Sequence, residues 1–408
     1  MTVGDFHKFC MDHKKIYCYG AGRYGRTILV HLREHGLDID SFLITGKPDE
    51  DEILGRSVKS IMDIDIDETV GIILAIGARF LEEMKQVLHE RNIRNYMVVD
   101  AHLLSLIEES TQFNVDGLCA RSINVLMYHR VVNDSRNIYG ISVSPRNFDL
   151  QMQFLKNHYH VLRFDEDWSS VKEPAVVVTF DDGYEDNYRN ALPILEKYEI
   201  PATFFVSTGN IGTGKLFWWD SLEGIFSSHP NFPIRMGERQ FSKQEMSEVH
   251  AFLHDMLPDE RDEIIDMALK KVGAFPDDIA SRRSLSVDEL RRLSESPFST
   301  IGVHTVTHSS LIHMSLEKKR WEINESKARL EKILSRKIDI FSYPFGDYDD
   351  DTLSLLPELN FKKACTVTGG LAFSDGGLRI PRNKVLDVDS TGFEKFLRQC
   401  QCIYESHL

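Results

Sequence analysis

A short apolar run that ends at two neighbouring carboxylates constrains the fold of this chain more than any other feature of its 408 residues. Residues 175–178 are apolar and mostly β-branched, and the sequence Thr-Phe-Asp-Asp-Gly-Tyr follows at 179–184. Such a run predicts a buried strand of an α/β sheet, with the two charged side chains placed at the carboxyl end of the strand. Burying Asp181 and Asp182 side by side without a partner would be costly. A bound divalent cation would remove that cost for one of them.

Two histidines further along the chain can complete a metal site. His304 and His308 have a His-x-x-x-His spacing, and neutral imidazole nitrogens are common zinc ligands. Together with one aspartate they would form an open three-ligand site. The alternative interpretation is a pair of core histidines beside a capping aspartate.

Three further strings accompany these two motifs. Leu-Met-Tyr-His stands at 126–129, Pro-Ala-Thr-Phe-Phe at 201–205 and Phe-Ser-Tyr-Pro-Phe-Gly at 341–346. With them, the sequence from about residue 122 to 390 resembles the polysaccharide deacetylase family, the NodB-like carbohydrate esterases, because several motifs occur in the family's order. The resemblance implies a distorted, incomplete (β/α) barrel. It does not cover the first hundred residues.

The resemblance also implies roles for the motif residues. The expected metal ligands are Asp182, His304 and His308, with zinc as the first choice and cobalt, nickel, iron or manganese as the others. Asp181 would stay off the metal and take the proton of the attacking water. Phe345 would offer its backbone N–H to the oxyanion, and Tyr343 would help to shape the slot for the acetyl group.

The chain departs from the commonest family pattern in two places. Ser342 stands where the third motif usually carries an arginine that pairs with the catalytic base. We predict that Arg382 holds Asp181 instead, with an ordinary salt bridge elsewhere as the alternative. The usual final Leu-x-His motif is not evident either. His129 is the expected general acid, and the alternative is a structural histidine at the barrel rim.

The first part of the chain begins with a glycine motif. Strand-like residues 14–19 precede Gly20, Gly22 and Gly25, and a helical stretch and a second strand at 39–44 follow. This β-α-β order predicts a small Rossmann-like domain whose glycine turn can bind an anion at a helix start. The second strand ends without an acidic residue for a dinucleotide ribose. A nucleotide or nucleotide-sugar ligand and a scaffold without a ligand both stay open.

The predicted fold class is α/β, in two domains. Residues 1–105 form the Rossmann-like domain, 106–121 a linker and 122–408 the deacetylase barrel, with a helical insertion at about 209–285. The barrel strands are expected at 123–127, 175–180, 202–206, 300–304, 338–343 and 363–368.

Three aromatic residues are further candidates for substrate binding. Trp218 and Trp219 near the start of the insertion could stack on sugar faces, and Tyr184 ends the first motif. The alternative for the tryptophans is that they pin the insertion to the barrel.

Charge and composition exclude several classes of protein. The formal net charge of −15 argues against a nucleic-acid partner. The first fifteen residues lack the apolar core of a secretory signal, and no apolar run is long enough to span a bilayer. The six cysteines form no Cys-x-x-Cys pair, so we expect reduced thiols and a cytoplasmic location.

These observations predict a metal-dependent hydrolase that removes acetyl from an N-acetylated amino sugar, free, lipid-linked or nucleotide-linked, in the synthesis of a surface glycan. An O-acetyl esterase or deformylase acting on a sugar is the alternative within the hydrolases. The alternative from another class is a nucleotide-dependent oxidoreductase or a sugar-binding protein with a degenerate barrel.

Overall fold

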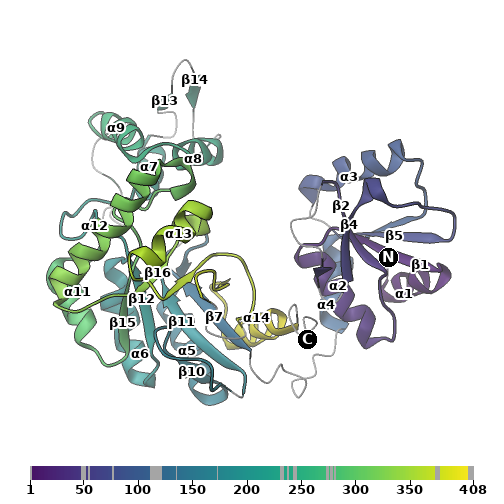
Figure 1. Ribbon diagram of the computed structural model, residues 1–408, viewed down its shortest axis with the longest axis horizontal. Helices are drawn as coiled ribbons and strands as arrows, with labels where there is room; N and C mark the ends of the chain where they lie inside the picture. The colour runs from purple at the N-terminus through teal and green to yellow at the C-terminus, as the bar shows by residue number, and fades with distance from the viewer. Residues whose placement is uncertain are drawn as a thin grey trace. The chain divides into compact units, whose positions relative to one another are not determined.

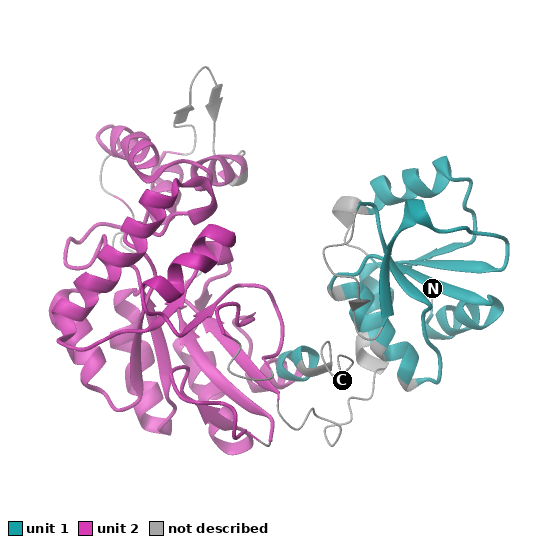
Figure 2. Ribbon diagram, in the orientation of Figure 1, with its two compact units in different colours: residues 1–119, 396–408 teal, residues 120–395 magenta. Residues whose placement is uncertain are grey.

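The structure is a computed structural model of the whole chain. It describes all residues except 1, 47–51, 54–55, 76–77, 111–121, 135, 172, 230–233, 237–238, 242–245, 273–274, 276–278, 280–281, 373–376 and 403–408. Two compact units divide the chain: unit 1 comprises Met1–Cys119 with Phe396–Leu408, and unit 2 comprises Ala120–Lys395 (Figure 2). The sequence had placed residues 396–408 in the second domain.

Unit 1 is a mostly parallel six-stranded sheet with helices packed on it (Figure 1). The strand order is β3-β4-β2-β1-β5-β6, and only β3 and β4 pair antiparallel. The elements are α1 Val3–Asp12, β1 Lys15–Tyr19, α2 Arg23–Glu34, β2 Ser41–Ile44, β3 Glu52–Ile53, β4 Arg56–Ser60, β5 Val70–Leu74, α3 Ala78–Glu90, β6 Tyr96–Val98 and α4 Ala101–Ser110. The strands expected at 14–19 and 39–44 are present as β1 and β2.

Strand β1 shows why unit 1 has a core on both faces of its sheet. Successive side chains of a strand point to opposite faces. Accordingly, Ile16 and Cys18 pack in one apolar cluster with α1, α2 and α4, and Tyr17 and Tyr19 pack in the other with α3. Helices and apolar clusters therefore cover both faces of the mostly parallel sheet.

Unit 2 is built on a curled, all-parallel sheet. Its strand order is β17-β16-β15-β12-β11-β7-β18, with β10 also paired to β11. The strands are β7 Ile123–Tyr128, β10 His160–Leu162, β11 Ala175–Phe180, β12 Ala202–Val206, β15 Ser299–Val303, β16 Ile340–Ser342, β17 Lys363–Cys365 and β18 Asn383–Lys384. The end strands β17 and β18 are not paired to each other in the described part of the chain, so the barrel is incomplete. The predicted fold class is confirmed.

Helices follow most of these strands and pack outside the sheet (Figure 1). They are α5 Pro145–His158, α6 Leu192–Tyr198, α11 Val287–Glu295, α12 Leu316–Leu334 and α13 Asp350–Glu358. The last helix, α14 Ser390–Cys402, begins in unit 2, and its residues from Phe396 onward belong to unit 1. Helix α11 begins with a capping box, because Ser286 Oγ accepts from Glu289 N and Ser286 N donates to the Glu289 carboxylate. Two short strands, β8 Arg130–Val131 and β9 Ser142–Val143, pair beside the sheet.

The insertion is a folded subdomain with its own apolar core. It contains α7 Trp218–Ser228, β13 Ile234–Met236, β14 Arg239–Phe241, α8 Met246–His254 and α9 Pro258–Leu269. Leu222, Val249 and Ile265 bring the three helices into one cluster, which Phe217 and Tyr184 join from the barrel side. The insertion is therefore packed onto the strand ends of the barrel. Of the helices in the described ranges, none combines the length and the apolar character needed to cross a bilayer.

Candidate metal and catalytic site

The carboxyl ends of the unit 2 strands meet at a cavity of about 220 Å³. Its lining residues are His129, Tyr139, Ile141, Asp181, Asp182, Trp219, His250, His304, His308, Phe345 and Val367. His129 follows β7, Asp181 follows β11 and His304 follows β15, and parallel strands place their carboxyl ends at one edge. The motif residues, far apart in the chain, therefore share one cavity.

Asp182, His304 and His308 form a compact donor cluster at this cavity. Asp182 Oδ1 lies 3.0 Å from His308 Nε2 and 3.6 Å from His304 Nε2, and the three donor atoms are all within 4.8 Å of one another. All three side chains are buried. Even so, Asp182 Oδ1 accepts no hydrogen bond of good geometry from any described residue. A buried carboxylate oxygen without such a bond, facing two imidazole nitrogens, fits a divalent cation.

The hydrogen bonds around the cluster fix which nitrogen of His304 faces it. His304 Nδ1–H donates to the carbonyl oxygen of Ser342 at 2.7 Å, so the lone pair lies on Nε2. Burial alone would raise the pKa of Asp182, but His308 and His304 hold it below its usual range. Burial lowers the pKa of His308. One charged carboxylate and two neutral imidazoles are the donor set expected for zinc or a similar ion.

The loop that carries the two histidines is held in an unusual backbone conformation. Thr305 and His308 have φ of 62° and 48°, in the left-handed region that side chains other than glycine rarely adopt. Glu322 of α12 accepts hydrogen bonds of 2.9 Å from Val306 N and Thr307 N. The surrounding hydrogen bonds therefore stabilise a strained loop that aims both rings at Asp182.

Asp181 is bound by an arginine from the far end of the barrel sequence. Arg382 Nη1 and Nη2 donate to its two carboxylate oxygens at 2.7 Å and 2.6 Å. Ser342 Oγ accepts from Arg382 at 2.9 Å and lies 3.4 Å from Asp181. Arg382 also donates to Thr179 Oγ1 and to the carbonyl of Thr366. The fully buried guanidinium is thus well satisfied.

The charge of Arg382 decides the protonation of Asp181. Burial acts to raise the pKa of Asp181, but the guanidinium outweighs it, and the pKa is lowered from its ordinary value. Asp181 is therefore ionised at neutral pH and lies beside the donor cluster without being part of it.

His129 lines the cavity at the end of β7. Burial lowers the pKa of its imidazole, while the charges of Asp182 and Asp181 act in the opposite direction. Asn187 Nδ2 donates to the carbonyl of His129 at 2.7 Å, which ties the backbone at this point. A histidine with these neighbours can exchange a proton with a group in the cavity.

The turn at Phe345 closes another side of the cavity. Phe345 has φ of 58°, and the backbone hydrogen bonds of the turn are donated by Gly346 N and Asp347 N. Its ring packs edge-on against His308, with centroids 4.7 Å apart. These hydrogen bonds of the turn do not use the N–H of Phe345. An oxyanion donor needs such an N–H.

Two of the residues expected to bind substrate, Tyr184 and Tyr343, do not line this cavity. The Tyr184 hydroxyl donates to Asp220 at 2.7 Å and accepts from Trp219 Nε1 at 2.8 Å, and its side chain is fully buried. The Tyr343 hydroxyl donates to the carbonyl of Leu378. Neither tyrosine lines the cavity. Trp219 does line it, with its ring 4.7 Å from that of His308.

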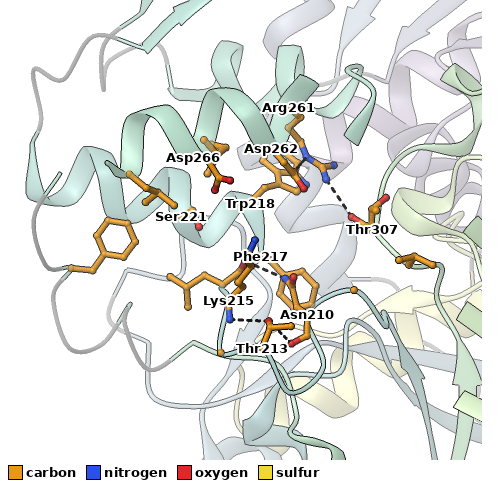
Figure 3. Close-up of a pocket in the computed structure, with 17 residues that line it drawn as sticks. Asn210, Thr213, Lys215, Phe217, Trp218, Ser221, Arg261, Asp262, Asp266 and Thr307 are labelled. Atoms are coloured by element: carbon orange, nitrogen blue, oxygen red, sulfur yellow. Dashed lines mark hydrogen bonds and ion pairs between the residues drawn. The ribbon is translucent and has the colours of Figure 1, made fainter. Parts of the chain in front are cut away.

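Trp218 lines a second, larger cavity of about 770 Å³ between the barrel and α9 (Figure 3). Figure 3 shows Arg261 and Asp266 of α9 on one side of this cavity and Asn210 and Lys215 of the preceding loop on the other. Arg261 Nη1 donates to Ser309 Oγ at 2.8 Å, which ties α9 to the loop of the metal-site histidines. Trp218 thus lines the larger cavity, and its neighbour in sequence, Trp219, lines the smaller one.

Two histidines of the insertion are site residues that sequence reasoning missed. His250 lines the small cavity, and its ring lies 4.7 Å from that of Trp218. His254 packs edge-on against Phe345 at 4.4 Å, and its Nε2 lies 3.2 Å from Asp347. Both belong to α8 and repeat the His-x-x-x-His spacing, which was the available signal.

The glycine turn of unit 1 has a distinct geometry at each glycine. Gly20 has φ of 116°, and a Cβ there would lie 2.4 Å from Ala75 O. A Cβ on Gly25 would lie 2.0 Å from Gly20 O. A Cβ on Gly22, which caps α2, would meet nothing within 4 Å. Gly20 and Gly25 are therefore required by the fold, whereas Gly22 borders open space at a helix start.

Comparison with known proteins finds likenesses to polysaccharide deacetylases within unit 2. Residues 169–364 match the family model described as polysaccharide deacetylase. The Bacillus subtilis (strain 168) protein named "Putative polysaccharide deacetylase YxkH" is 22% identical over 261 residues, which cover 62% of this chain and 67% of that protein.

Two other comparisons carry names of the same kind. A poly-β-1,6-N-acetyl-D-glucosamine N-deacetylase of Staphylococcus aureus (strain MSSA476) is 35% identical over 111 residues, or 21% of this chain. The match spans only 36% of that relative's length. The crystal structure of a polysaccharide deacetylase from Bacillus cereus superposes with a TM-score of 0.46 at 22% identity, over 68% of this chain and 69% of that one.

Proposed function

Because residues 169–364 match the polysaccharide deacetylase family model, we propose that the chain is a metal-dependent hydrolase that removes acetyl from an N-acetylated amino sugar of a glycan. One observation carries the proposal. The ligand-type cluster of Asp182 with two histidines lies beside a second carboxylate, Asp181, that Arg382 holds ionised. An ion site next to a separately held base is what hydrolysis of an amide by water needs.

The ion would be held by Asp182, His304 and His308. When bound, a divalent cation supplies Lewis acidity to the acyl oxygen and lowers the pKa of water. Zinc suits one carboxylate and two imidazoles, and cobalt, nickel, iron and manganese are the other candidates.

The chain's own residues perform the proton transfers. Asp181 takes a proton from the attacking water, whose oxygen bonds to the acetyl carbon. The Phe345 N–H donates to the oxygen on which negative charge develops. His129 gives a proton to the sugar nitrogen as the C–N bond breaks, which releases acetate and an amine. A lowered pKa makes His129 a stronger acid, although a smaller fraction of it is charged at neutral pH.

The larger cavity would receive sugar units that flank the one being deacetylated. It combines the aromatic side chains of Phe217 and Trp218 with charged groups of both signs, including Lys215 and Asp266. Aromatic faces with a few polar groups are typical of carbohydrate-binding sites. A relative named for poly-β-1,6-N-acetyl-D-glucosamine makes N-acetylglucosamine oligomers the first substrates to test.

The function is tested by a mass-spectrometric screen of acetylated amino sugars, free, lipid-linked and nucleotide-linked. We expect a loss of one acetyl mass that disappears when metal is removed, returns when zinc is added and is absent from Asp182→Ala. Release of acetate only from O-acetyl esters, or of formate from N-formyl sugars, would replace the N-deacetylase with the other hydrolases. Deacetylation that persists in metal-free protein would contradict the metal-dependent mechanism.

The larger cavity has its own test. Asp266→Ala should lower kcat/KM for oligomers by several-fold and leave the free monosaccharide unaffected, because only the longer substrate reaches it. Glu263→Ala is the matched control, since Glu263 is exposed on the same helix but does not line the cavity. An equal effect on oligomer and monosaccharide would exclude a flanking-sugar site there.

A further inference from the structure

Unit 1 contains a second group of metal-ligand side chains, formed by three histidines. His7 lies on α1, His31 lies on the last turn of α2 and His35 caps that helix. Their ring centroids are 4.9 Å apart for His7 and His31, 4.5 Å for His7 and His35, and 4.4 Å for His31 and His35. One nitrogen from each ring lies within 4.8 Å of the other two.

The orientation of the rings directs lone pairs toward one another. His35 Nδ1–H donates to the carbonyl of His31 at 2.8 Å, which leaves the lone pair of His35 on Nε2. His7 Nε2 and His31 Nε2 are 2.7 Å apart, so without an ion one of them must carry a proton and donate to the other. Replacing this proton with a cation would let all three rings act as donors.

Burial and neighbouring histidines act on two of the rings, those of His7 and His31. Burial lowers the pKa of His7, and it lowers that of His31 to about 4. The charges that act on both groups are those of neighbouring histidines, which lower their pKa values further. Neutral imidazole is the form that binds a metal ion.

The position of the cluster suggests what an ion would do there. Phe6 and Leu32, the neighbours of His7 and His31 in sequence, are fully buried in the core that α1 and α2 share. His31 is buried, whereas His35 is exposed, so an ion can reach the cluster from solvent and still bind a buried ring. Bound there, it would link the first helix of the chain to α2.

We propose that His7, His31 and His35 bind one transition-metal ion of the zinc, nickel or cobalt class, and that this ion clamps α1 to α2 in unit 1. Three imidazoles favour these borderline ions over magnesium or calcium, which prefer oxygen ligands. With three protein ligands the ion keeps an open position on the exposed side. The site is independent of the Asp182 cluster, which lies in the other unit.

The test counts zinc ions bound to the untagged, full-length chain by elemental analysis after removal of loosely bound metal. The background is Asp182→Ala, which removes the barrel ion if that site exists. We expect one ion per chain in this background and none when His7→Gln and His35→Gln are added. His89→Gln, an exposed histidine of α3 outside the cluster, should leave the count unchanged.

A second measurement guards against loss of folding. Added zinc should raise the thermal midpoint of Asp182→Ala but not of the form that also carries His35→Gln, whose exposed side chain can change without disturbing the core. An equal zinc count with and without His7→Gln and His35→Gln would overturn the proposal. The three histidines would then only hydrogen-bond to one another. Failure of the barrel site would appear differently, as equal counts in the wild type and Asp182→Ala.

Discussion

Arg382 donates two hydrogen bonds to the carboxylate of Asp181, although 201 residues separate the two in the chain. The small side chain of Ser342 lies beside this pair, and its Oγ accepts from the same guanidinium. An arginine from the segment before β18 therefore occupies the place beside the base that the family resemblance assigns to the third motif. The pairing makes the ionisation of Asp181 depend on one residue.

Arg382→Met should move the acidic limb of the pH–rate profile to higher pH. Burial favours the neutral form of Asp181 and the charge of Arg382 overcomes it, so removing that charge raises the pKa of the base. Arg382→Lys keeps a charge but loses the two-point contact and should shift the limb less. Arg379→Met, an exposed arginine nearby, is the control. An unmoved limb in Arg382→Met would remove this arginine from the mechanism.

The same substitution should destabilise unit 2. Because the pKa of Asp181 is lowered in the folded state, the ion pair stabilises the fold above about pH 4, and this stability is lost as the pH falls through the lowered pKa. Leaving a buried carboxylate without its partner costs about 3–5 kcal/mol. Urea unfolding at neutral pH should therefore show a clear loss for Arg382→Met and none for Arg379→Met.

Asp181→Asn should separate the base from the metal site beside it. The amide keeps the size of the side chain but accepts no proton, so we expect turnover to fall roughly a hundredfold or more. The ion at Asp182 should remain, because Asp181 is not in the donor cluster. Elemental analysis and single-turnover rates check both parts. A wild-type rate in this variant would end the proposed mechanism.

His129→Gln should affect substrates according to their leaving groups. An amide nitrogen must be protonated before it leaves, whereas an activated ester leaves without help, so the amide rate should fall by about a hundredfold or more and the ester rate should change little. Comparing kcat for the two substrates on one preparation measures this difference. Equal losses would assign His129 a structural role at the barrel rim.

Gly22→Val tests whether unit 1 binds a nucleotide or nucleotide-sugar. A side chain there meets no other atom within 4 Å, so the variant should fold normally and still hydrolyse a small substrate, but its side chain would block an anion at the start of α2. Calorimetric titration should show binding to the wild type and not to the variant. Gly25→Val would instead clash with Gly20 O and should unfold unit 1. If the wild type binds no such ligand, the turn serves as a scaffold.

The strands of unit 2 could be predicted because their signal is local. Each predicted strand is a short apolar run, and each is present, for example β7, β11 and β12. The expectation that motif residues gather at strand ends followed from the geometry of parallel sheets. Strands β10 and β18 were missed, since each has only two or three residues and little periodicity.

Contacts made by the insertion could not be predicted in the same way. Tyr184 belongs to a motif at the site, yet its hydroxyl hydrogen-bonds to Trp219 and Asp220. The side chain of Tyr184 therefore does not line the cavity. Such a contact depends on how α7 packs against the barrel, which no local pattern encodes. His254 reaches Phe345 for the same reason, although its spacing from His250 was visible in the sequence.

The contact between His254 and Asp347 predicts a pH-dependent stability of the insertion. Hydrogen bonding to Asp347 raises the pKa of His254 despite partial burial. Charged His254 therefore stabilises the fold below about pH 6.5, and this contribution is lost as the pH rises through the raised pKa of the folded state. Asp347 has a lowered pKa and must stay ionised, which sets the acidic end of the window.

A double-mutant cycle isolates this pair. His254→Gln should cost up to about 1 kcal/mol at mildly acidic pH, as expected for a half-buried ion pair, and nothing above the raised pKa. In an Asp347→Asn background the cost should shrink, because only Asp255, 2.7 Å from His254 Nδ1, then remains as a charged partner. Urea unfolding at several pH values gives the coupling energy. A coupling that does not change between pH 6 and pH 9 would show that His254 holds α8 against Phe345 by packing alone, since packing does not titrate.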